Sequence, residues 1–412
     1  MKDNRESMQV LMSFEETAKS FEIPVFEKRA GVAHIKAGNT DSFFMQLDEL
    51  ARLNELHSSI LRFKIDQVAG QGFLMDEENV TASDKLENIN SLGGINDMLP
   101  KIAYDSVKYG GFALLVTWSR DYRSWVEINH IPFDKVRCMP VNARGEIDQF
   151  VFRYDWTKTR QPETIFEAYN YNQVTQRAEQ FKKAVQTGDL AQLDGVDDLE
   201  HTQLLYFKPY SSDSFYYPYP DYIACLSSIR ADISVNAYSE KGLANGMNDI
   251  TTVTFLGEYN AEQKKKTAGV LMKNHTGAAK TGAPLILFAK TKEKAPIIDK
   301  VKETGSEKKF KTIAEQTRQK ILSGHRVTNP NLMGIPTTSG LGSKDELITA
   351  YTIFFTTVIK PKQLEILKVF NRLMKINDYP SLSIDKLDAL DTANTEVDED
   401  NTEVDEPINN EL

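Results

Sequence analysis

The chain has 412 residues, of which 41% are apolar; this is enough for a sizeable hydrophobic core and predicts two or three domains. Its longest apolar runs, at 112–116 and 285–289, are far shorter than the roughly 20 residues of a membrane-spanning helix, and the first residues lack the apolar stretch of a secretory signal. The sequence therefore indicates a protein that is made and kept in a cytoplasm-like compartment, or carried in a particle assembled there, and that has no membrane partner.

The net charge of −10 is unevenly distributed along the chain. Residues 258–326 hold 16 Lys or Arg against seven acids, whereas residues 391–412 hold nine acids and no basic residue. One segment could therefore face phosphate groups, while most of the surface and the tail would repel them. The two cysteines, Cys138 and Cys225, are too few and too far apart for a disulfide scaffold, so we expect reduced, partly buried thiols.

The first part of the chain predicts a loose arm followed by helices. Residues 1–40 show no firm period, whereas over 42–68 apolar residues recur three or four positions apart and predict one helix that ends at Gly70. Residues 76–98 are polar and predict a loop with a short helix. Another helix is predicted over 99–108, and Gly110 and Gly111 directly after it should end it.

Short β-rich segments come next, separated by turn-forming residues. Strands are predicted over 112–118, 125–131, 134–140 and 147–154, with further strands at 168–171 and 203–207. The polar stretch 176–200 has few apolar residues and predicts an insertion at the surface.

A small βαβ unit between two helices is predicted in the second half. The first helix follows the proline-rich stretch 216–220 and ends near Gly242. A β-branched run at 251–256, a helix capped by Asn260 and a second strand at 284–289 predict the βαβ unit.

The second flanking helix is predicted from Ser306 to Gly324, with an apolar stripe on one face. An irregular stretch at 326–343 follows, and Ser343 then starts a capping box before a long apolar helix. Pro361 should kink or divide that helix, because proline lacks the amide that the helix requires.

The end of the chain is acidic and repetitive. The hexamer Asn-Thr-Glu-Val-Asp-Glu occurs at 394–399 and again at 401–406. Such a segment cannot bury enough apolar surface to order itself, so we expect a disordered tail.

Patterns of catalytic and metal-binding residues are missing from the sequence. The glycine pair of 277–282 has the spacing of a phosphate-binding loop, but Ala283 and Pro284 stand where that loop needs its lysine and hydroxyl residue. No two histidines have the spacing of a zinc site, and no GxSxG motif occurs. We therefore expect no enzyme activity, no metal and no cofactor.

Two clusters allow both a structural and a functional interpretation. The aromatic stretch 210–222 could stack bases, although packing against a helix is the commoner use of such residues. The run of Lys264, Lys265 and Lys266 could contact phosphates or an acidic partner, or simply form the solvated face of a helix.

The order of motifs from Tyr109 to Met374 resembles that of the portal proteins of tailed bacteriophages. The matching segments are Tyr109-Gly110-Gly111-Phe112-Ala113, Ile131-Pro132-Phe133-Asp134-Lys135-Val136-Arg137, Tyr217-Pro218-Tyr219-Pro220-Asp221-Tyr222-Ile223, Lys241-Gly242-Leu243-Ala244-Asn245-Gly246, Glu315-Gln316-Thr317-Arg318 with Lys320-Ile321, Val327 to Gly334, and Glu346, Tyr351 and Ile359-Lys360-Pro361. No single segment is as specific as a metal-binding signature, and the resemblance rests on their order and spacing.

The resemblance implies an α+β fold with a mixed α/β wing, paired stem helices, a small α/β clip, a long kinked wing helix and a disordered acidic tail. The implied boundaries are an N-terminal arm at 1–24, the β-rich wing at 25–220, stem helix 1 at 221–246, the clip at 247–303, stem helix 2 at 304–325, the tunnel loop at 326–343, the wing helix at 344–380, and a reduced crown with the tail at 381–412.

The resemblance also implies a function. Portal proteins form a homo-oligomeric ring of about twelve subunits at one capsid vertex of the virion. Double-stranded DNA enters and leaves through the channel of the ring. The implied partners are the terminase large subunit, the major capsid protein, the head–tail adaptor and, in some systems, a scaffold protein.

Two sets of residues would carry this function. The tunnel loop would narrow the channel with Asn331, Leu332, Met333, Gly334, Ile335, Pro336, Thr337, Thr338, Ser339, Gly340, Leu341 and Gly342. The basic residues of stem and clip that could face DNA or the terminase are Lys264, Lys265, Lys266, Lys308, Lys309, Lys311, Arg318 and Lys320.

Three other interpretations compete with a portal. Another head–tail adaptor or minor capsid protein is the main alternative, but most adaptors are shorter and lack a long glycine-rich loop between two helices. A nuclease would need a constellation of carboxylates or histidines. A cellular DNA-binding protein would bind short duplexes tightly, which an acidic ring should not do.

Overall fold

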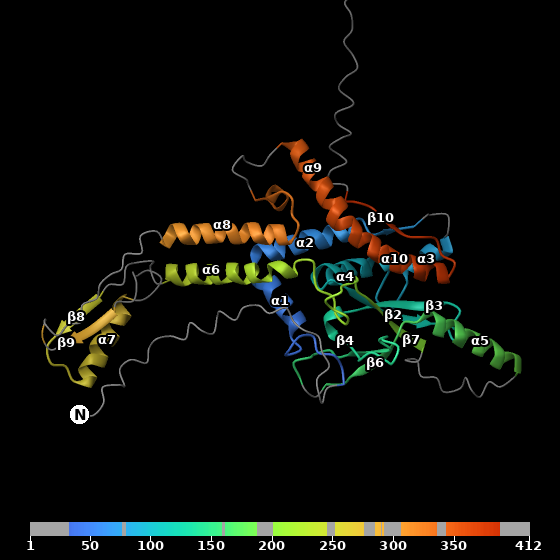
Figure 1. The fold of residues 1–412 in the computed structure, drawn as a ribbon, viewed down its shortest axis with the longest axis horizontal. Helices are drawn as coiled ribbons and strands as arrows, with labels where there is room; N and C mark the ends of the chain where they lie inside the picture. Colours follow the sequence, from blue (N-terminus) through green and yellow to red (C-terminus); the bar gives the residue numbers. More distant parts are fainter. Residues whose placement is uncertain are drawn as a thin grey trace, which may run out of the picture. The chain divides into compact units, whose positions relative to one another are not determined.

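The computed structural model describes residues 33–75, 80–158, 161–187, 201–244, 252–275, 285–289, 291, 306–335 and 343–387. The chain forms two compact units, which are shown in Figure 1 and are treated separately below. Unit 1 consists of the described residues within Met1–Cys225 and Leu322–Leu412, and unit 2 of those within Leu226–Ile321.

A six-stranded mixed sheet lies at the centre of unit 1. In spatial order its strands are β3 (Trp125–Ile131), β2 (Phe112–Trp118), β7 (Thr202–Phe207), β6 (Thr164–Ala168), β5 (Gln149–Phe152) and β4 (Val136–Cys138). The β6–β7 pair is parallel, and the pairs β2–β3, β2–β7, β4–β5 and β5–β6 are antiparallel. The mixed α+β class is confirmed, and so are the strands predicted over 112–118 and 125–131.

The region after β5 differs from the prediction. β6 ends where a strand was expected to begin, and helix α5 (Tyr171–Thr187) occupies the first part of the stretch that was predicted as a surface insertion. Val174 is the buried residue of α5. Apolar residues recur in it at helical spacing, at 174, 178, 181 and 185, and the Gln, Lys and Ala residues around them favour a helix, so low apolar content was a poor guide to its structure.

Two helices, α1 (Phe43–Leu53) and α2 (Glu55–Ala69), replace the single helix predicted at the start of unit 1. Asn54 separates them in an extended conformation, and its side chain accepts a hydrogen bond from the amide of His57 at 2.8 Å. Because the break rotates the buried face, Leu53 is 54% exposed although it continues the apolar pattern. A side-chain cap thus overrides a continuous periodicity.

Helices α3 (Val80–Glu87) and α4 (Ile95–Lys108) follow. The helix predicted to begin at residue 99 begins four residues earlier, because the Asp97 side chain accepts the amide of Gly94 at 2.8 Å and caps the first turn. Gly70 ends α2 at a φ of 54°, as predicted.

A long helical segment near the end of unit 1 consists of α9 (Lys344–Phe354), a π-helical turn (Phe355–Ile359) and α10 (Lys360–Ile376). The Ser343 hydroxyl accepts the amide of Glu346 at 3.2 Å, which confirms the predicted cap. The predicted division at Pro361 occurs as the π-helical turn directly before it, a common way to accommodate a missing amide.

Strands β1 (Phe73–Leu74) and β10 (Ser383–Ile384) pair antiparallel. The chain after α10 therefore folds back onto unit 1 within the segment expected to hold a reduced crown. The acidic repeats of the predicted tail lie outside the described residues.

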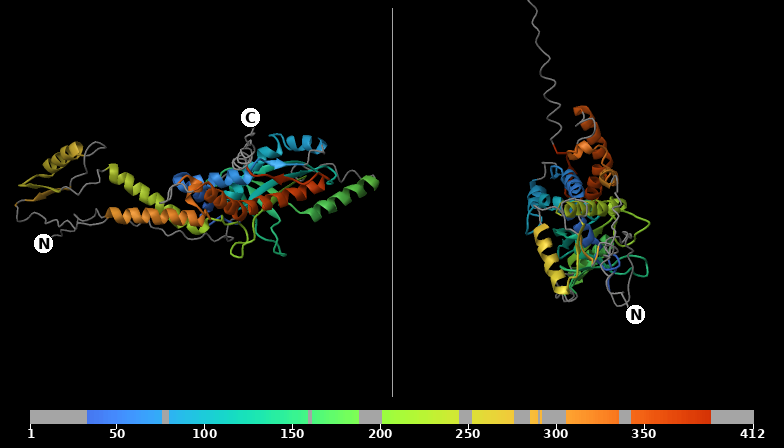
Figure 2. Two further views of the ribbon diagram at one scale, coloured as in Figure 1. Left: turned by 90° about the horizontal axis from the view of Figure 1, so that it is seen from above. Right: turned by 90° about the vertical axis from the view of Figure 1, so that its left-hand side faces the viewer.

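Unit 2 consists of α6 (Leu226–Ala244), β8 (Thr252–Leu256), α7 (Ala261–His275), β9 (Leu285–Ala289) and α8 (Ser306–Gly324), whose last three residues belong to unit 1. β8 and β9 are parallel and α7 connects them, so the predicted βαβ unit is confirmed (Figure 2). Asn260 and Gln263 form reciprocal hydrogen bonds at the start of α7, at 2.8 and 3.0 Å.

Candidate functional site

The predicted basic residues lie on two helices of unit 2. Lys264, Lys265 and Lys266 are exposed on the first turns of α7, and the ammonium of Lys264 lies 5.9 Å from the centre of the Phe288 ring. On α8, the exposed basic residues are Lys311, Arg318 and Lys320. Lys308 and Lys309 belong to the same helix, but their side chains lie outside the described part of the structure.

The end of α8 is a Schellman motif that leads directly into the predicted tunnel loop. The amide of Val327 donates to the carbonyl of Leu322, and that of Arg326 to Ser323, both at 2.9 Å. Arg326 takes the left-handed position of this motif with a φ of 61°, a place that glycine usually occupies. The helix ends at Gly324, as predicted, and the Schellman motif closes its last turn.

The described part of the predicted loop is held against α9. The Asn329 side chain donates to Glu346 at 3.2 Å, and the Thr328 hydroxyl donates to the carbonyl of Ala350 at 3.2 Å. A 3₁₀ turn over Pro330–Met333 follows, and Gly334 closes it with a φ of 69°. The base of the loop is thus a folded structure with its own hydrogen bonds.

The predicted loop residues differ in exposure. Asn331 is buried and Gly334 is exposed, while Leu332, Met333 and Ile335 are half-buried. Pro336, Thr337, Thr338, Ser339, Gly340, Leu341 and Gly342 lie outside the described residues.

Arg326 also links the loop to the π-helical turn. Pro361 has no amide to donate to the carbonyl of Thr357 four residues earlier. The Arg326 guanidinium donates to that carbonyl at 2.9 Å. Arg326, two residues after the end of α8, therefore stabilises the point at which the long helix changes its winding.

Three buried aromatic rings of unit 1 meet next to this loop. His57 of α2 and His325 are both 0% exposed, and Nδ1 of His57 lies 2.8 Å from Nε2 of His325. The Tyr222 ring lies 4.7 Å from His57 and 5.0 Å from His325, measured between ring centres. The Tyr222 hydroxyl donates to the carbonyl of Lys108 at 2.6 Å. We call these three residues the ring cluster.

Cationic residues surround the ring cluster. Burial, together with the charges of Lys108 and Lys64, lowers the pKa of His57 to about 3. Burial and the charge of Lys64 also lower the pKa of His325 well below its usual value. Both imidazoles are therefore neutral near pH 7.

Lys64 is itself buried on the same face of α2. Burial lowers its pKa to about 8, although the nearby carboxylate of Asp221 opposes the shift. The ammonium of Lys362 lies 3.3 Å from Asp221, and Lys108 lies 2.6 Å from Asp48. Two of the surrounding lysines thus have a carboxylate partner that limits the cost of their burial.

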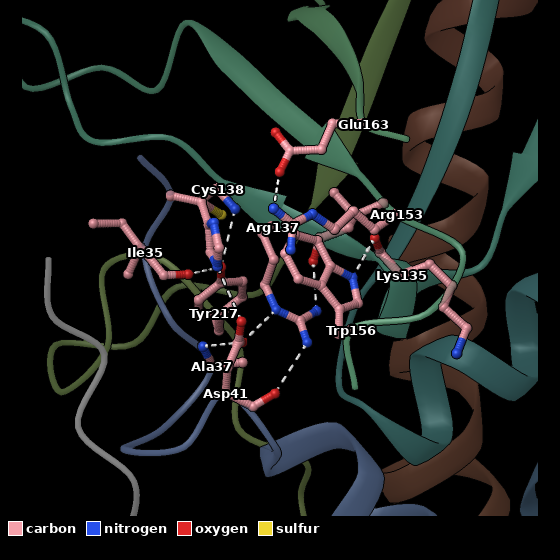
Figure 3. A network of polar contacts seen from close by, with 12 residues as sticks. Ile35, Ala37, Asp41, Lys135, Arg137, Cys138, Arg153, Trp156, Glu163 and Tyr217 are labelled. Atoms are coloured by element: carbon pink, nitrogen blue, oxygen red, sulfur yellow. Dashed lines mark hydrogen bonds and ion pairs between the residues drawn. The ribbon is translucent and has the colours of Figure 1, made fainter. Parts of the chain in front are cut away.

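A second polar network fastens the start of the described chain to β4 (Figure 3). The fully buried Arg137 donates to the Asp41 carboxylate at 2.6 Å and to the carbonyl of Asp134 at 2.7 Å. Its guanidinium lies 4.5 Å from the centre of the Trp156 ring. The amide of Ile35 donates to the carbonyl of Cys138 at 2.8 Å and extends the edge of the sheet.

The aromatic stretch 210–222 serves mainly in packing. Tyr217 is 0% and Tyr222 1% exposed, and the Tyr217 hydroxyl accepts the amide of Cys138 at 3.0 Å. Tyr210, by contrast, is 93% exposed. The buried rings cannot stack on bases, so the structural interpretation of this stretch holds for them.

The two thiols are buried and free, as predicted. Burial raises the pKa of Cys138 to about 12 and that of Cys225 to about 11, so neither is a reactive thiolate at neutral pH.

Sequence reasoning missed the ring cluster and the Arg137 network. His57 and His325 are 268 positions apart, so no local motif joins them. One signal was available: His57 and Lys64 are seven residues apart, which places them on the apolar face of a helix. A buried histidine and lysine on one helix face indicate partners from elsewhere in the chain.

Within the described ranges, no three His, Cys, Asp or Glu side chains are grouped so that they could hold a metal ion. None of the described helices has both the length and the apolar content that a membrane span requires.

No protein-family model matches the chain, and no curated protein sequence is similar to it. Solved structures with a similar fold come from gene transfer agent particles. A chain in the virion of the native particle has a TM-score of 0.52 at 14% identity, over 92% of this chain and 91% of that chain. A chain in the neck of the empty particle, computed with C6 symmetry, has a TM-score of 0.52 at 14% identity, over 92% and 90% of the two chains.

A third similar chain lies in the neck of the native particle, computed with C12 symmetry. Its TM-score is 0.50 at 13% identity, over 85% of this chain and 88% of that chain. At these identities the likeness is one of fold.

Proposed function

We propose that this chain is a portal-type subunit, which forms a ring at one vertex of a phage-like particle and surrounds the channel for DNA packaging and ejection. The observation that carries the proposal is the fold likeness, which spans 92% of this chain and 90% of a chain in a particle neck. A match over both whole chains supports a shared architecture of all parts and not of one common module.

The layout of the chain supports the same function. Unit 2 is inserted between Cys225 and Leu322, and it begins with α6 and ends with α8. In the proposal these helices are the stem, the βαβ unit is the clip that docks the terminase and later the tail connector, and unit 1 is the wing. Residues 326–343 form the tunnel loop, whose base is fixed to α9.

An exposed apolar residue on the described part of α8 supports a ring. Ile313 is 44% exposed, whereas Thr317 and Ile321 on the same stripe are buried. In a ring, the same helix surface recurs beside each neighbour, so side chains of this kind can be buried between subunits. The exposed basic residues of α7 and α8 would meet DNA or the terminase.

The acidic surface suits a channel that must release DNA. Each phosphate contact strengthens binding and makes it steeply dependent on salt, so a channel with many cationic contacts would hold the duplex. The net charge of −10, with an excess of basic over acidic residues in the segment 258–326, instead favours transient contacts. The energy for movement would come from a separate ATPase.

The order of particle assembly tests this function against the adaptor alternative. A portal must be present before DNA enters, whereas an adaptor is needed only after packaging. DNA-free precursor shells would be purified, and a gold-labelled tag on this chain would be located by electron microscopy, with the major capsid protein as the control for whole-shell labelling. We expect label at one vertex of each empty shell. Label confined to DNA-filled particles, or spread over the shell, would contradict the proposal.

A further inference from the structure

The ring cluster lies in unit 1 at the two places where the chain leaves it and returns. Tyr222 precedes the last unit 1 residue, Cys225, by three positions, and His325 follows the returning residue, Leu322, by three positions. His57, in the middle of unit 1 sequence, contacts both. The hydrogen bond between the two imidazoles thus joins α2 to the residue after α8, and ring contacts join both imidazoles to Tyr222 before α6.

The proton count of the pair limits what it can accept. In the neutral pair one ring nitrogen donates and the other accepts, so the facing nitrogens share one proton. The outer nitrogens, Nε2 of His57 and Nδ1 of His325, are buried without a hydrogen-bond partner. The first proton added to the pair goes to the outer nitrogen that carries a lone pair, where the new charge and its N–H group are buried without a partner. The next proton puts two N–H groups against each other at 2.8 Å and removes the hydrogen bond.

The surroundings also oppose a positive charge. Lys64 from α2 and Lys108 from α4 act on His57, and Lys64 acts on His325. Lys362 and Arg326 add positive charge around Lys64, which the carboxylate of Asp221 opposes, while the nearby Cys225 is a neutral thiol in this pH range. Asp48 is the carboxylate partner of Lys108, and Tyr222 is the remaining titratable group on the rings.

We propose that the His57–His325 pair is an acid-sensitive clasp, which holds the two chain crossings together while both imidazoles are neutral and opens when they take up protons. In the opened clasp the two imidazoles are exposed and have an ordinary pKa near 6.5. In the closed clasp the pKa of both histidines is far lower. Stability of the closed form is therefore complete above pH 6.5 and is lost as the pH falls below it. For each histidine, the opening equilibrium should rise about tenfold per pH unit until the closed form itself is protonated.

Histidine exchange tests the clasp without a variant. Exchange of the imidazole C2 proton with deuterium, followed by mass spectrometry of the full-length protein, reports the pKa of each histidine. We expect His57 and His325 to titrate well below 6.5. Titration of both near 6.5 in the folded protein would overturn the proposal.

Backbone exchange reports the opening itself. Amides at the two crossings, such as Cys225 and Val327, donate to Tyr222 and Leu322 and are protected while the clasp is closed. After correction for the pH dependence of intrinsic exchange, their protection should fall about tenfold or more per pH unit between pH 6 and 4.5. The amides of β2 should keep their protection over this range.

A matched pair of variants separates the clasp from general acid unfolding. His57→Phe combined with His325→Phe keeps two rings against Tyr222 but removes titration, so protection at the crossings should become independent of pH in this range. His201→Phe is the control, because His201 stacks on Tyr122 away from the clasp and its loss should leave the pH dependence unchanged. A wild-type protein with flat protection, or a double variant that keeps the pH dependence, would refute the clasp.

Discussion

At Gly324 the backbone of α8 passes so close to Cys225 that a Cβ atom would overlap the Cβ and Sγ atoms of that cysteine. The residue that ends one long helix is thus in contact with the residue that precedes the other. Glycine is required here because a side chain would overlap Cys225. The backbone conformation is not the reason, since the φ of Gly324 is not in the left-handed region.

Gly324→Ala should therefore destabilise unit 1 by about 1–3 kcal/mol through overpacking. The measurement is urea unfolding followed by tryptophan fluorescence, since Trp118, Trp125 and Trp156 all lie in unit 1. Combining it with Cys225→Gly should recover part of the loss. Gly269→Ala is the control, because nothing lies within 4 Å of the added methyl. Equal effects of the two alanine variants would refute the contact.

The Arg137–Asp41 pair makes a second residue-scale prediction. Burial alone would raise the pKa of Asp41, but hydrogen bonds from His34 and the amide of Ala37, and the charge of Arg137, hold it below its usual value. The stability from this carboxylate is therefore present above pH 3.8 and is lost as the pH falls through the lowered pKa.

Arg137→Leu should cost about 3–5 kcal/mol at pH 7, because it removes the cationic partner of the partly buried Asp41 carboxylate, which keeps only its hydrogen bonds from His34 and Ala37. The cost should shrink when Asp41→Asn is added, and also in acid. Urea unfolding at pH 7 and pH 3 measures both effects. A cost that does not change with pH or with the second substitution would show that Arg137 acts through packing alone.

At the scale of elements, the described part of the loop after α8 is a folded base. Hydrogen bonds to Glu346 and Ala350 fix residues 328 and 329 to α9. Replacing residues 334–342 with a short flexible linker should therefore leave the fold and the assembly of subunits intact but impair packaging or retention of DNA.

The measurement for the loop variant is the DNA content of purified particles. Asn329→Ala is the companion variant: it removes the contact with Glu346 and should weaken unit 1 without shortening the loop. Normal DNA-filled particles from the linker variant would contradict the tunnel-loop assignment.

The end of the chain gives a pair of truncations with opposite outcomes. β10 pairs with β1, and Leu382 is buried with its amide donating to Asn371 at 2.7 Å. Removal of residues 391–412 should leave assembly and thermal stability unchanged. Removal of 381–412 should lower the melting temperature, because it exposes Leu382 and leaves β1 unpaired.

Thermal unfolding and native mass spectrometry of both truncations test this boundary. If removal of residues 391–412 prevented assembly, the acidic tail would have a structural role that its composition does not indicate.

Sequence patterns predicted some elements closely and others poorly, for physical reasons. β2 and β3 were predictable because their apolar residues are bounded by glycine and turn residues, and α8 because its apolar stripe and Gly324 mark its face and end. The break at Asn54 was missed because one side-chain hydrogen bond divides an otherwise continuous pattern. The ring cluster was missed because its contacts are long-range and depend on the finished fold.

At the scale of the whole molecule, the chain combines an inserted unit with a sheet-based unit that continues on both sides of it. Residues 258–326, which include α7 and α8, hold 16 Lys or Arg against seven acids, whereas residues 391–412 hold nine acids and no basic residue. Under the proposed function, the basic segment would meet phosphates or the packaging motor, and the net acidic remainder would not retain DNA.

The central claim is that the subunits close into a ring, and electron microscopy of the purified full-length protein with native mass spectrometry tests it most directly. We predict rings of about twelve subunits with a central opening, stable over a range of ionic strength because apolar surface is buried between neighbours. Subunits that remain monomers or dimers at every concentration and salt would contradict the account.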